Sequence, residues 1–217
     1  MKKTTVLFVH GFGVKGDARG MFTEIAEHLG SAHVECILMD LNGTDDKGNI
    51  LVNPFSMQVA LLQEVRGRYK DTKVILIAHS QGCLVSAMAD LSDISTSIFL
   101  APSVSSSPDL MIAHFEKNHD TVINREGMSE IARSDGTTTM VPAKYWLERD
   151  QVDVRDIYEI YQKERDVIVV IAGEDEVVDN KHTNSIFNYS GKTPLKTDHY
   201  FTGAGRNQLF DICMRYV

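Results

Sequence analysis

The sequence has little of what marks several special classes of protein. Its three cysteines, Cys36, Cys83 and Cys213, are an odd number at wide spacing, which fits reduced buried thiols better than a disulfide framework or a zinc site. We therefore expect a reducing compartment, the cytoplasm. Nowhere do about 18 apolar residues follow one another, so we expect no membrane span. The net charge is −8 without a basic cluster, which argues against nucleic acid or an anionic membrane as a partner.

The first residues match the beginning of a signal peptide only briefly. Lys2 and Lys3 precede an apolar run over 6–9, but this run is too short for the hydrophobic region of a signal peptide, and we expect a mature start. The chain has 217 residues, of which 43% are hydrophobic and 24% are charged. A chain of this size and composition can bury a full core as one domain over 1–217.

Apolar runs typical of buried strands alternate with segments of helical periodicity. The expected strands are 4–9, 34–39, 74–78, 97–100, 167–172 and, more weakly, 193–197. The expected helices are 21–29, 57–69, 81–91, 157–162 and 208–216. This alternation predicts an α/β fold with a doubly wound, mostly parallel sheet of about six strands and helices on both faces.

A long segment interrupts this alternation between Leu100 and Val167. It holds about 60 residues, many more than an ordinary crossover needs, and we predict a cap or lid insertion over 104–156. The dipeptide at 135–136, Asp-Gly, favours a two-residue type I′ turn and hence a β-hairpin between strands at 129–134 and 137–141. Four aromatic residues of this region either line a substrate pocket or pack the insertion onto the body of the protein: Phe115, Tyr145, Trp146 and Tyr158.

The segment 73–82, KVILIAHSQG, runs from an apolar strand into a helix across a single serine, Ser80. Such a tight turn holds the serine in strained backbone geometry and leaves room only for small residues two positions away, here Ala78 and Gly82. This is the nucleophile pattern G-x-S-x-G with alanine in the first position. A buried serine in an ordinary strand–helix turn fits the five residues equally well, so other parts of the chain must decide.

A glycine-rich turn over 10–13, HGFG, follows the first expected strand. Backbone N–H groups exposed there could stabilise the oxyanion of a tetrahedral intermediate, and we predict an oxyanion hole formed by the N–H groups of Phe12 and Gln81. The same segment matches the dinucleotide-binding pattern G-x-G-x-x-G, with Asp40 at the end of the next strand. Against that alternative, the following helix begins too late for Gly16 to pack against the strand.

A histidine near the end of the chain could act as general base. His199 follows the last expected strand, from which it can reach back to a serine on a central strand. His79 adjoins Ser80 and should project away from it, while His182 falls at an expected helix start. Both are therefore poorer candidates.

The acidic loop 174–179 follows the expected strand 167–172. A buried carboxylate there would fix the tautomer of the histidine. We choose Asp175 because it stands two residues before a pair of valines, although Glu174 or Glu176 could do the same. Asp179 is better placed as the N-cap of the next helix.

The chain resembles the α/β-hydrolase family over most of its length outside the insertion. The matching motifs are the glycine-rich turn at 10–13 and, in the order nucleophile, acid and base, the segments 78–82, 173–175 and 198–200. The resemblance implies a minimal α/β-hydrolase fold with strand order 2-1-3-4-5-6. Ser80 would then follow strand 3 and the oxyanion turn strand 1, so both would meet where a doubly wound sheet opens its crevice. In the family, two residues more often separate the glycine, here Gly173, from the acid of the triad. Glu174, Asp175 and Glu176 therefore all remain candidates for this acid.

These features predict a serine hydrolase that cleaves carboxylic esters through an acyl-enzyme, with Ser80 as nucleophile, His199 as base and Asp175 orienting it. No metal or cofactor is implied, and the expected partner is a small-molecule ester. The resemblance and the insertion imply a small-to-medium acyl group, such as the aromatic acid of a cinnamoyl-type ester. Because a fold does not fix a function, a thioesterase or other acyl hydrolase, or a binding protein without turnover, is the alternative.

Overall fold

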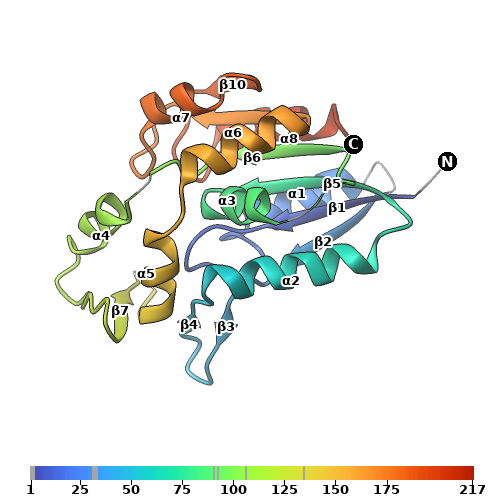
Figure 1. Ribbon diagram of the computed structural model, residues 1–217. Coiled ribbons are helices and arrows are strands. Elements are labelled where there is room, and N and C mark those ends of the chain that lie inside the picture. The colour runs from blue at the N-terminus through green and yellow to red at the C-terminus, as the bar shows by residue number, and fades with distance from the viewer. Residues whose placement is uncertain (1–2, 31–33, 90, 92, 106, 134) are drawn as a thin grey trace.

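Six parallel strands form the centre of the structure (Figure 1). The computed structural model describes residues 3–30, 34–89, 91, 93–105, 107–133 and 135–217. The strands lie in the order β10-β9-β6-β5-β1-β2, so the predicted order 2-1-3-4-5-6 is confirmed. Their bounds are β1 Thr4–Val9, β2 Glu35–Met39, β5 Lys73–His79, β6 Thr96–Leu100, β9 Val167–Ala172 and β10 Gly191–Leu195.

The central strands are mostly apolar because helices cover both faces of the sheet. In β9 every residue is buried, and in β5 only the first residue is exposed. Alternate residues of β1 enter different cores: Leu7 packs on one face of the sheet and Phe8 on the other. This is the two-residue periodicity of a strand.

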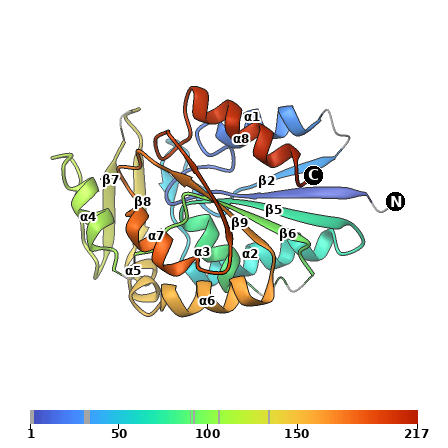
Figure 2. The ribbon, with the colours of Figure 1, turned by 90° about the horizontal axis from the view of Figure 1, so that it is seen from above.

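Helices cover the two faces of the sheet in two groups (Figure 2). On one face lie α1 Met21–Leu29 and α8 Ala204–Met214. On the other lie α2 Phe55–Arg68, α3 Gln81–Met88 and α6 Val154–Glu164. The prediction for α1 matches its bounds, whereas α3 ends three residues before the predicted Leu91, with residue 90 outside the described part of the chain. No helix among the described residues has both the length and the apolar character needed to cross a membrane.

A second sheet of four strands lies beyond the carboxyl ends of the first, in the order β3-β4-β8-β7 (Figures 1 and 2). Its strands are β3 Gly43–Thr44, β4 Ile50–Leu51, β7 Met128–Ala132 and β8 Thr138–Pro142. The strands β7 and β8 form an antiparallel hairpin. The predicted two-residue turn is wrong, because the connection spans 133–137 and is closed by the N–H of Arg133 bonded to Thr137 O.

The longer turn has a local cause. A type I′ turn needs positive φ at both central residues, and of the predicted pair only Gly136 has it, with φ 83. The carboxylate of Asp135 instead accepts hydrogen bonds from the backbone N–H and the hydroxyl of Thr137. Ser134, part of the predicted hairpin, lies outside the described residues.

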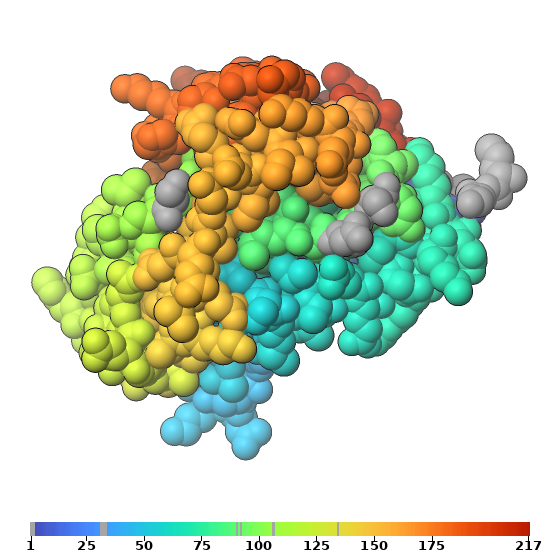
Figure 3. All heavy atoms as spheres, in the orientation of Figure 1, coloured from blue at the N-terminus to red at the C-terminus, as the bar shows by residue number. Residues whose placement is uncertain are grey.

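The second sheet combines two regions of the chain. Strand β4, from the connection between β2 and α2, pairs in parallel with β8 of the predicted insertion. The helices α4 Asp109–Phe115 and α5 Ala143–Asp150 flank this sheet. The carboxylate of Glu148 on α5 also accepts hydrogen bonds from Ser56 at the start of α2. The space-filling view shows the 104–156 segment packed on the body, with the β3–β4 hairpin projecting beneath it (Figure 3).

Candidate active site

Ser80 occupies the sharp turn between β5 and α3. Its backbone has φ 51 and ψ −120, a region that residues other than glycine rarely adopt. The turn is held by the N–H of Ser80, which donates to Leu100 O, and by Ser80 O, which accepts from Cys83 N and Ser103 N. Ser80 is 8% exposed, so most of the residue is enclosed while part of it still reaches solvent.

Gly82 allows α3 to approach the end of β1. A Cβ atom on this residue would lie 2.2 Å from Val9 O and 2.5 Å from His10 O. Both atoms belong to the backbone and cannot move aside without shifting β1. Ala78, on the other side of the serine, is fully buried in β5. The small residues of the motif are thus required by close packing around the turn.

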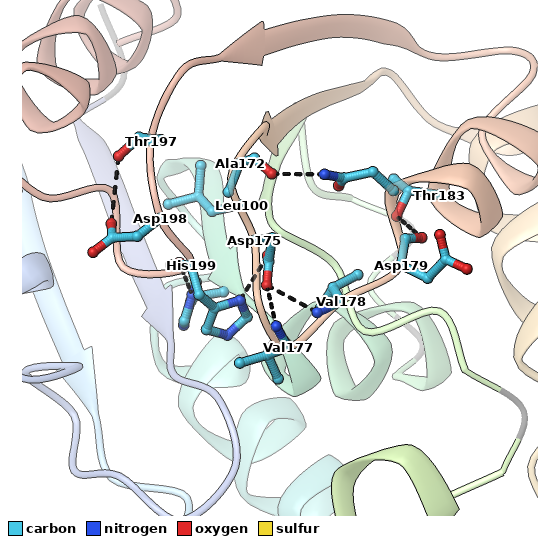
Figure 4. Close-up of polar contacts among 12 residues, drawn as sticks. Leu100, Ala172, Asp175, Val177, Val178, Asp179, Thr183, Thr197, Asp198 and His199 are labelled. Atoms are coloured by element: carbon cyan, nitrogen blue, oxygen red, sulfur yellow. Dashed lines mark hydrogen bonds and ion pairs between the residues drawn. The ribbon is translucent and has the colours of Figure 1, made fainter. Parts of the chain in front are cut away.

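His199 and Asp175 are hydrogen-bonded to each other beside this turn (Figure 4). His199 Nδ1 lies 2.8 Å from Asp175 Oδ2, and both side chains are almost completely buried. Asp175 Oδ1 accepts the N–H groups of Val177 and Val178, each at 2.8 Å. A histidine that donates from Nδ1 to a carboxylate keeps the lone pair on Nε2, as a general base requires.

The neighbouring acids lie elsewhere. Glu174 is exposed and faces Lys196 at 4.0 Å, and Glu176 lies on the wall of the adjacent cavity. Asp179 is the N-cap of α7, Asn180–Ile186, as predicted, and accepts from Lys181 N. The exposed side chain of His182 lies 3.2 Å from Asp179 Oδ2. Of these residues, the structure therefore brings Asp175 to His199.

A cavity of about 170 Å³ joins the predicted site residues. Ser80 and His199 line it together with Phe12 and Gln81. Outside the helices and strands of the described chain, no hydrogen bond is donated by the N–H of Phe12 or Gln81. Gln81 is the first residue of α3, and the first N–H groups of a helix have no partner within it. Among the described residues, the two N–H groups predicted to form an oxyanion hole thus have no hydrogen-bond partner, and both residues line the cavity.

A family model described as the alpha/beta hydrolase fold matches residues 4–91. The chain has the α/β-hydrolase fold. Among solved structures, Est1E from Butyrivibrio proteoclasticus aligns with a TM-score of 0.74 at 18% identity, over 99% of this chain and 87% of Est1E. The monoacylglycerol lipase of Paleococcus ferrophilus aligns with a TM-score of 0.68 at 14% identity, over 98% of this chain and 93% of the lipase.

Tomato methylketone synthase I, solved with 2-tridecanone, aligns with a TM-score of 0.69 at 14% identity, over 100% of this chain and 98% of the synthase. No curated protein matched the chain in a sequence comparison. The structural matches at such low identity establish the fold, and the resemblance inferred from the sequence motifs is confirmed at that level.

In this α/β-hydrolase fold, His10 supports the glycine-rich turn. Its Nε2 accepts the N–H of Leu41 at 2.9 Å, so its Nδ1 carries the proton and donates to Gly11 O at 2.8 Å. Burial lowers the pKa of His10 and favours this neutral form. A Cβ atom at Gly11 would lie 3.0 Å from Ser80 Cβ, so the turn supported by His10 directly contacts the serine.

His79 supports the loop that carries His199, a role that the sequence analysis missed. Its Nε2 lies 3.0 Å from His199 O, to which it donates, and the two rings lie 4.6 Å apart. Burial, with the nearby His199, holds the pKa of His79 well below its usual value, so the ring is neutral. This contact joins residues 120 positions apart, which no local pattern reveals.

Three of the four aromatic residues predicted as possible pocket residues lie in the core, and the prediction is wrong for them. Phe115 lines the cavity, whereas Tyr145, Trp146 and Tyr158 are fully or almost fully buried. Each has a partner for its polar group: Tyr145 donates to Gln81 Oε1 at 2.5 Å, Trp146 to Ser129 Oγ at 3.0 Å and Tyr158 to Ser103 O at 3.1 Å. They pack the inserted segment onto the body, the other role considered for them.

The dinucleotide-binding alternative does not fit the geometry of the first connection. Helix α1 begins only at Met21, and the N–H of Gly16 is bonded to Asp40 Oδ1 at 2.5 Å. The carboxylate that would bind a ribose is therefore occupied by the backbone, and Gly16 lies away from the helix N-terminus that would face a pyrophosphate.

Proposed function

We propose that the protein is a serine hydrolase that cleaves carboxylic esters through an acyl-enzyme. The observation that carries this proposal is the arrangement around one cavity, with Ser80 in a strained turn and His199 bonded through Nδ1 to the buried Asp175. A histidine held in this tautomer accepts a proton at Nε2, which activates a hydroxyl group as a nucleophile.

In the proposed reaction, Ser80 Oγ attacks the ester carbonyl while His199 Nε2 takes its proton. The N–H groups of Phe12 and Gln81 bind the oxyanion of the tetrahedral intermediate, and the N-terminal end of α3 adds a favourable dipole. His199 then protonates the leaving alcohol. A water molecule deprotonated by the same nitrogen releases the acid and restores Ser80.

The cavity favours a small-to-medium acyl group. Apolar side chains form much of its wall, including Val104, Met111, Phe115 and Val177. Est1E, one of the structural relatives, has been solved with ferulic acid, an aromatic acid of the kind expected from the sequence. We propose a substrate with an apolar or aromatic acid, while a thioester or another activated acyl group would use the same residues.

The first test is hydrolysis of p-nitrophenyl acetate and butyrate by the wild type and by Ser80→Ala. We expect Ser80→Ala to lower kcat by at least about a thousandfold, because the nucleophile is lost. A fluorophosphonate probe should label the wild type at Ser80, as located by mass spectrometry. The control is Ser86→Ala, which removes a buried serine of α3 that bonds only to Gly82 O in its own helix.

The two readouts together decide the proposal. Turnover and labelling that are lost in Ser80→Ala but kept in Ser86→Ala support it. A wild type that neither turns over nor becomes labelled points to a binding protein of the same fold, and turnover retained in Ser80→Ala assigns the chemistry to another residue.

A further inference from the structure

Two arginines that have no salt-bridge partner in the described part of the chain line the cavity of the proposed active site. Arg19 comes from the connection after β1, and Arg133 from the connection between β7 and β8. Both line the cavity that contains Ser80, and both also line a second hollow of about 490 Å³ next to it. Neither forms a salt bridge among the described residues.

Each guanidinium group is positioned by neighbouring groups. That of Arg19 lies 4.8 Å from the ring centre of Tyr200, next in sequence to His199, and that of Arg133 lies 5.6 Å from the ring centre of Phe115. Arg133 also donates to Thr139 Oγ1 and to Gly13 O, each at 2.7 Å. Cations held over aromatic faces keep N–H donors free at their edges.

The two positive charges repel each other. Burial lowers the pKa of Arg133, and the charge of Arg19 lowers it further. Asp17 accepts the N–H of Arg19, and Asp135 accepts the N–H of Thr137. Neither carboxylate forms a salt bridge with the pair among the described residues, although the charge of Asp135 partly offsets the lowering of the Arg133 pKa. An anion bound between the two guanidinium groups would remove this repulsion.

A third arginine makes the same cavity more positive. Arg149 on α5 lines the cavity, is only 4% exposed and has a buried Nη1 without a hydrogen-bond partner in the described chain. Its other terminal nitrogen, Nη2, donates to Ser105 O. The acidic residues on the cavity wall are Glu176 and Asp179, and Asp179 caps α7. Three guanidinium groups thus face two carboxylates in a chain whose net charge is −8.

We propose that the substrate is a monoester that keeps a free carboxylate, and that Arg19 and Arg133 bind this carboxylate. Arginine suits this role because its planar group donates two parallel hydrogen bonds to a carboxylate. The inference rests on the proposed ester hydrolysis and adds the charge of the substrate. Because the pair borders both hollows, the carboxylate end would lie at Arg19 and Arg133, where the cavity of Ser80 meets the second hollow.

The test compares anionic with neutral esters by the release of acid at constant pH. Monoethyl glutarate and ethyl valerate differ in charge on the acyl side, and 4-acetoxybutyrate and butyl acetate differ in charge on the alcohol side. In at least one pair, we expect kcat/KM of the wild type to be at least about tenfold higher for the anionic ester. This preference should fall in high salt, disappear in Arg19→Gln and return in part in Arg19→Lys.

Arg133→Gln is the second variant. Because Arg133 also donates to Gly13 O in the glycine-rich turn, its loss can lower the turnover of both kinds of ester. Its readout is therefore the ratio of kcat/KM for the anionic ester to that for the neutral ester. The control is Arg68→Gln, an exposed arginine on α2 that pairs with Glu64, which should leave the ratio unchanged. Equal turnover of anionic and neutral esters by the wild type, or a preference that survives both glutamine variants, overturns the inference while leaving ester hydrolysis intact.

If no ester is hydrolysed, that result counts against the proposed function. The carboxylate site can then still be tested by a binding measurement. Ser80→Ala is titrated with glutarate by calorimetry. Saturable binding that is lost when Arg19→Gln is added supports the carboxylate site. No binding, or binding that the added substitution leaves unchanged, overturns it.

Discussion

Backbone strain in single residues is concentrated where the proposed chemistry takes place. Positive φ angles occur outside glycine at Ala18, Arg19, Ser80, Ala101 and Phe201. All of them lie in connections that follow β1, β5, β6 or β10, at the carboxyl end of the main sheet. Strained residues persist only where their surroundings hold them in place. Ser80 is held by its N–H, which donates to Leu100 O, and by its carbonyl oxygen, which accepts from Ser103 N.

The close packing of Gly82 leads to a prediction for stability. Gly82→Ala would place a Cβ atom against two backbone carbonyls, and we expect a loss of about 1–3 kcal/mol in the free energy of unfolding, together with lower activity. The control is Gly67→Ala in α2, where a Cβ atom meets nothing within 4 Å and should stabilise the helix by up to about 1 kcal/mol. Urea denaturation measures both, and equal stability of the two variants would contradict this account.

The acid of the proposed triad can be tested by isosteric substitution. Asp175→Asn removes the charge beside His199 Nδ1 and permits the wrong tautomer, so we expect kcat to fall by about ten-thousandfold, as for comparable triads. Glu176→Gln is the matched control and should retain kcat near the wild-type value. A large loss of kcat in Glu176→Gln, together with a kcat near the wild-type value in Asp175→Asn, would assign the acid to Glu176 instead. The substrate in both cases is p-nitrophenyl butyrate.

Short-range patterns were enough to place some of these residues. The spacing of Ala78, Ser80 and Gly82 encodes the turn directly, because steric limits act between neighbours. The order of the strands placed the acidic loop 174–179 near His199, but it left Glu174, Asp175 and Glu176 open as the acid. The supporting contacts made by His10 and His79 could not be predicted, because their partners lie 31 and 120 positions away.

At the scale of elements, α5 connects the inserted segment to the proposed oxyanion hole. Tyr145 donates to Gln81 Oε1, and Gln81 Nε2 donates to Gln58 Oε1 on α2. The side chain of Gln81 is thus held from two sides. A displacement of α5 would therefore also move Gln81, the first residue of α3 and a residue of the cavity wall.

Removal of one hydroxyl tests this connection. Tyr145→Phe leaves Gln81 Oε1 without its donor, and we expect a loss of about 1–2 kcal/mol of stability and a lower kcat with p-nitrophenyl butyrate. Tyr161→Phe is the control. Tyr161 lies on α6, is as buried as Tyr145 and does not line the cavity, and its hydroxyl is hydrogen-bonded to Ser97 Oγ at 2.8 Å. Both variants should lose stability, and only Tyr145→Phe should lose activity. Equal kcat in both would exclude the connection.

The elements that the sequence analysis missed share a physical cause. The helices α4 and α5 have only 7 and 8 residues, which is too short to show clear helical periodicity. The strands β3 and β4 have 2 residues each; they pair with each other, and β4 also pairs with the distant β8. The long apolar strands of the main sheet, in contrast, are specified by their own composition.

For the whole molecule, two buried histidines predict how stability depends on pH. The pKa values of His10 and His79 are lowered, mainly by burial, below the ordinary value of 6.5. The unfolded chain therefore binds protons that the folded protein does not, and stability falls as the pH drops below about 6.5. The slope should approach about 1.4 kcal/mol per pH unit for each histidine.

The measurement is the free energy of unfolding in urea between pH 5.5 and 7.5 at constant ionic strength. His10→Asn should flatten the slope by removing one of the two groups, and His119→Asn, which changes an exposed histidine, should leave it unchanged. The same slope in all three proteins would show that His10 takes up a proton in the folded state.

The pairing of β4 with β8 also has a consequence for how the chain folds. It joins segments 89 positions apart, as in the hydrogen bond from Thr138 N to Asn49 Oδ1. Such a distant pairing forms late, because the intervening chain must first be confined. During synthesis, β4 leaves the ribosome well before its partner exists, so its edge stays open until the second half of the protein emerges. The second sheet is therefore completed only after β1, β5 and β6 of the main sheet have been made, and before β9 and β10 are added.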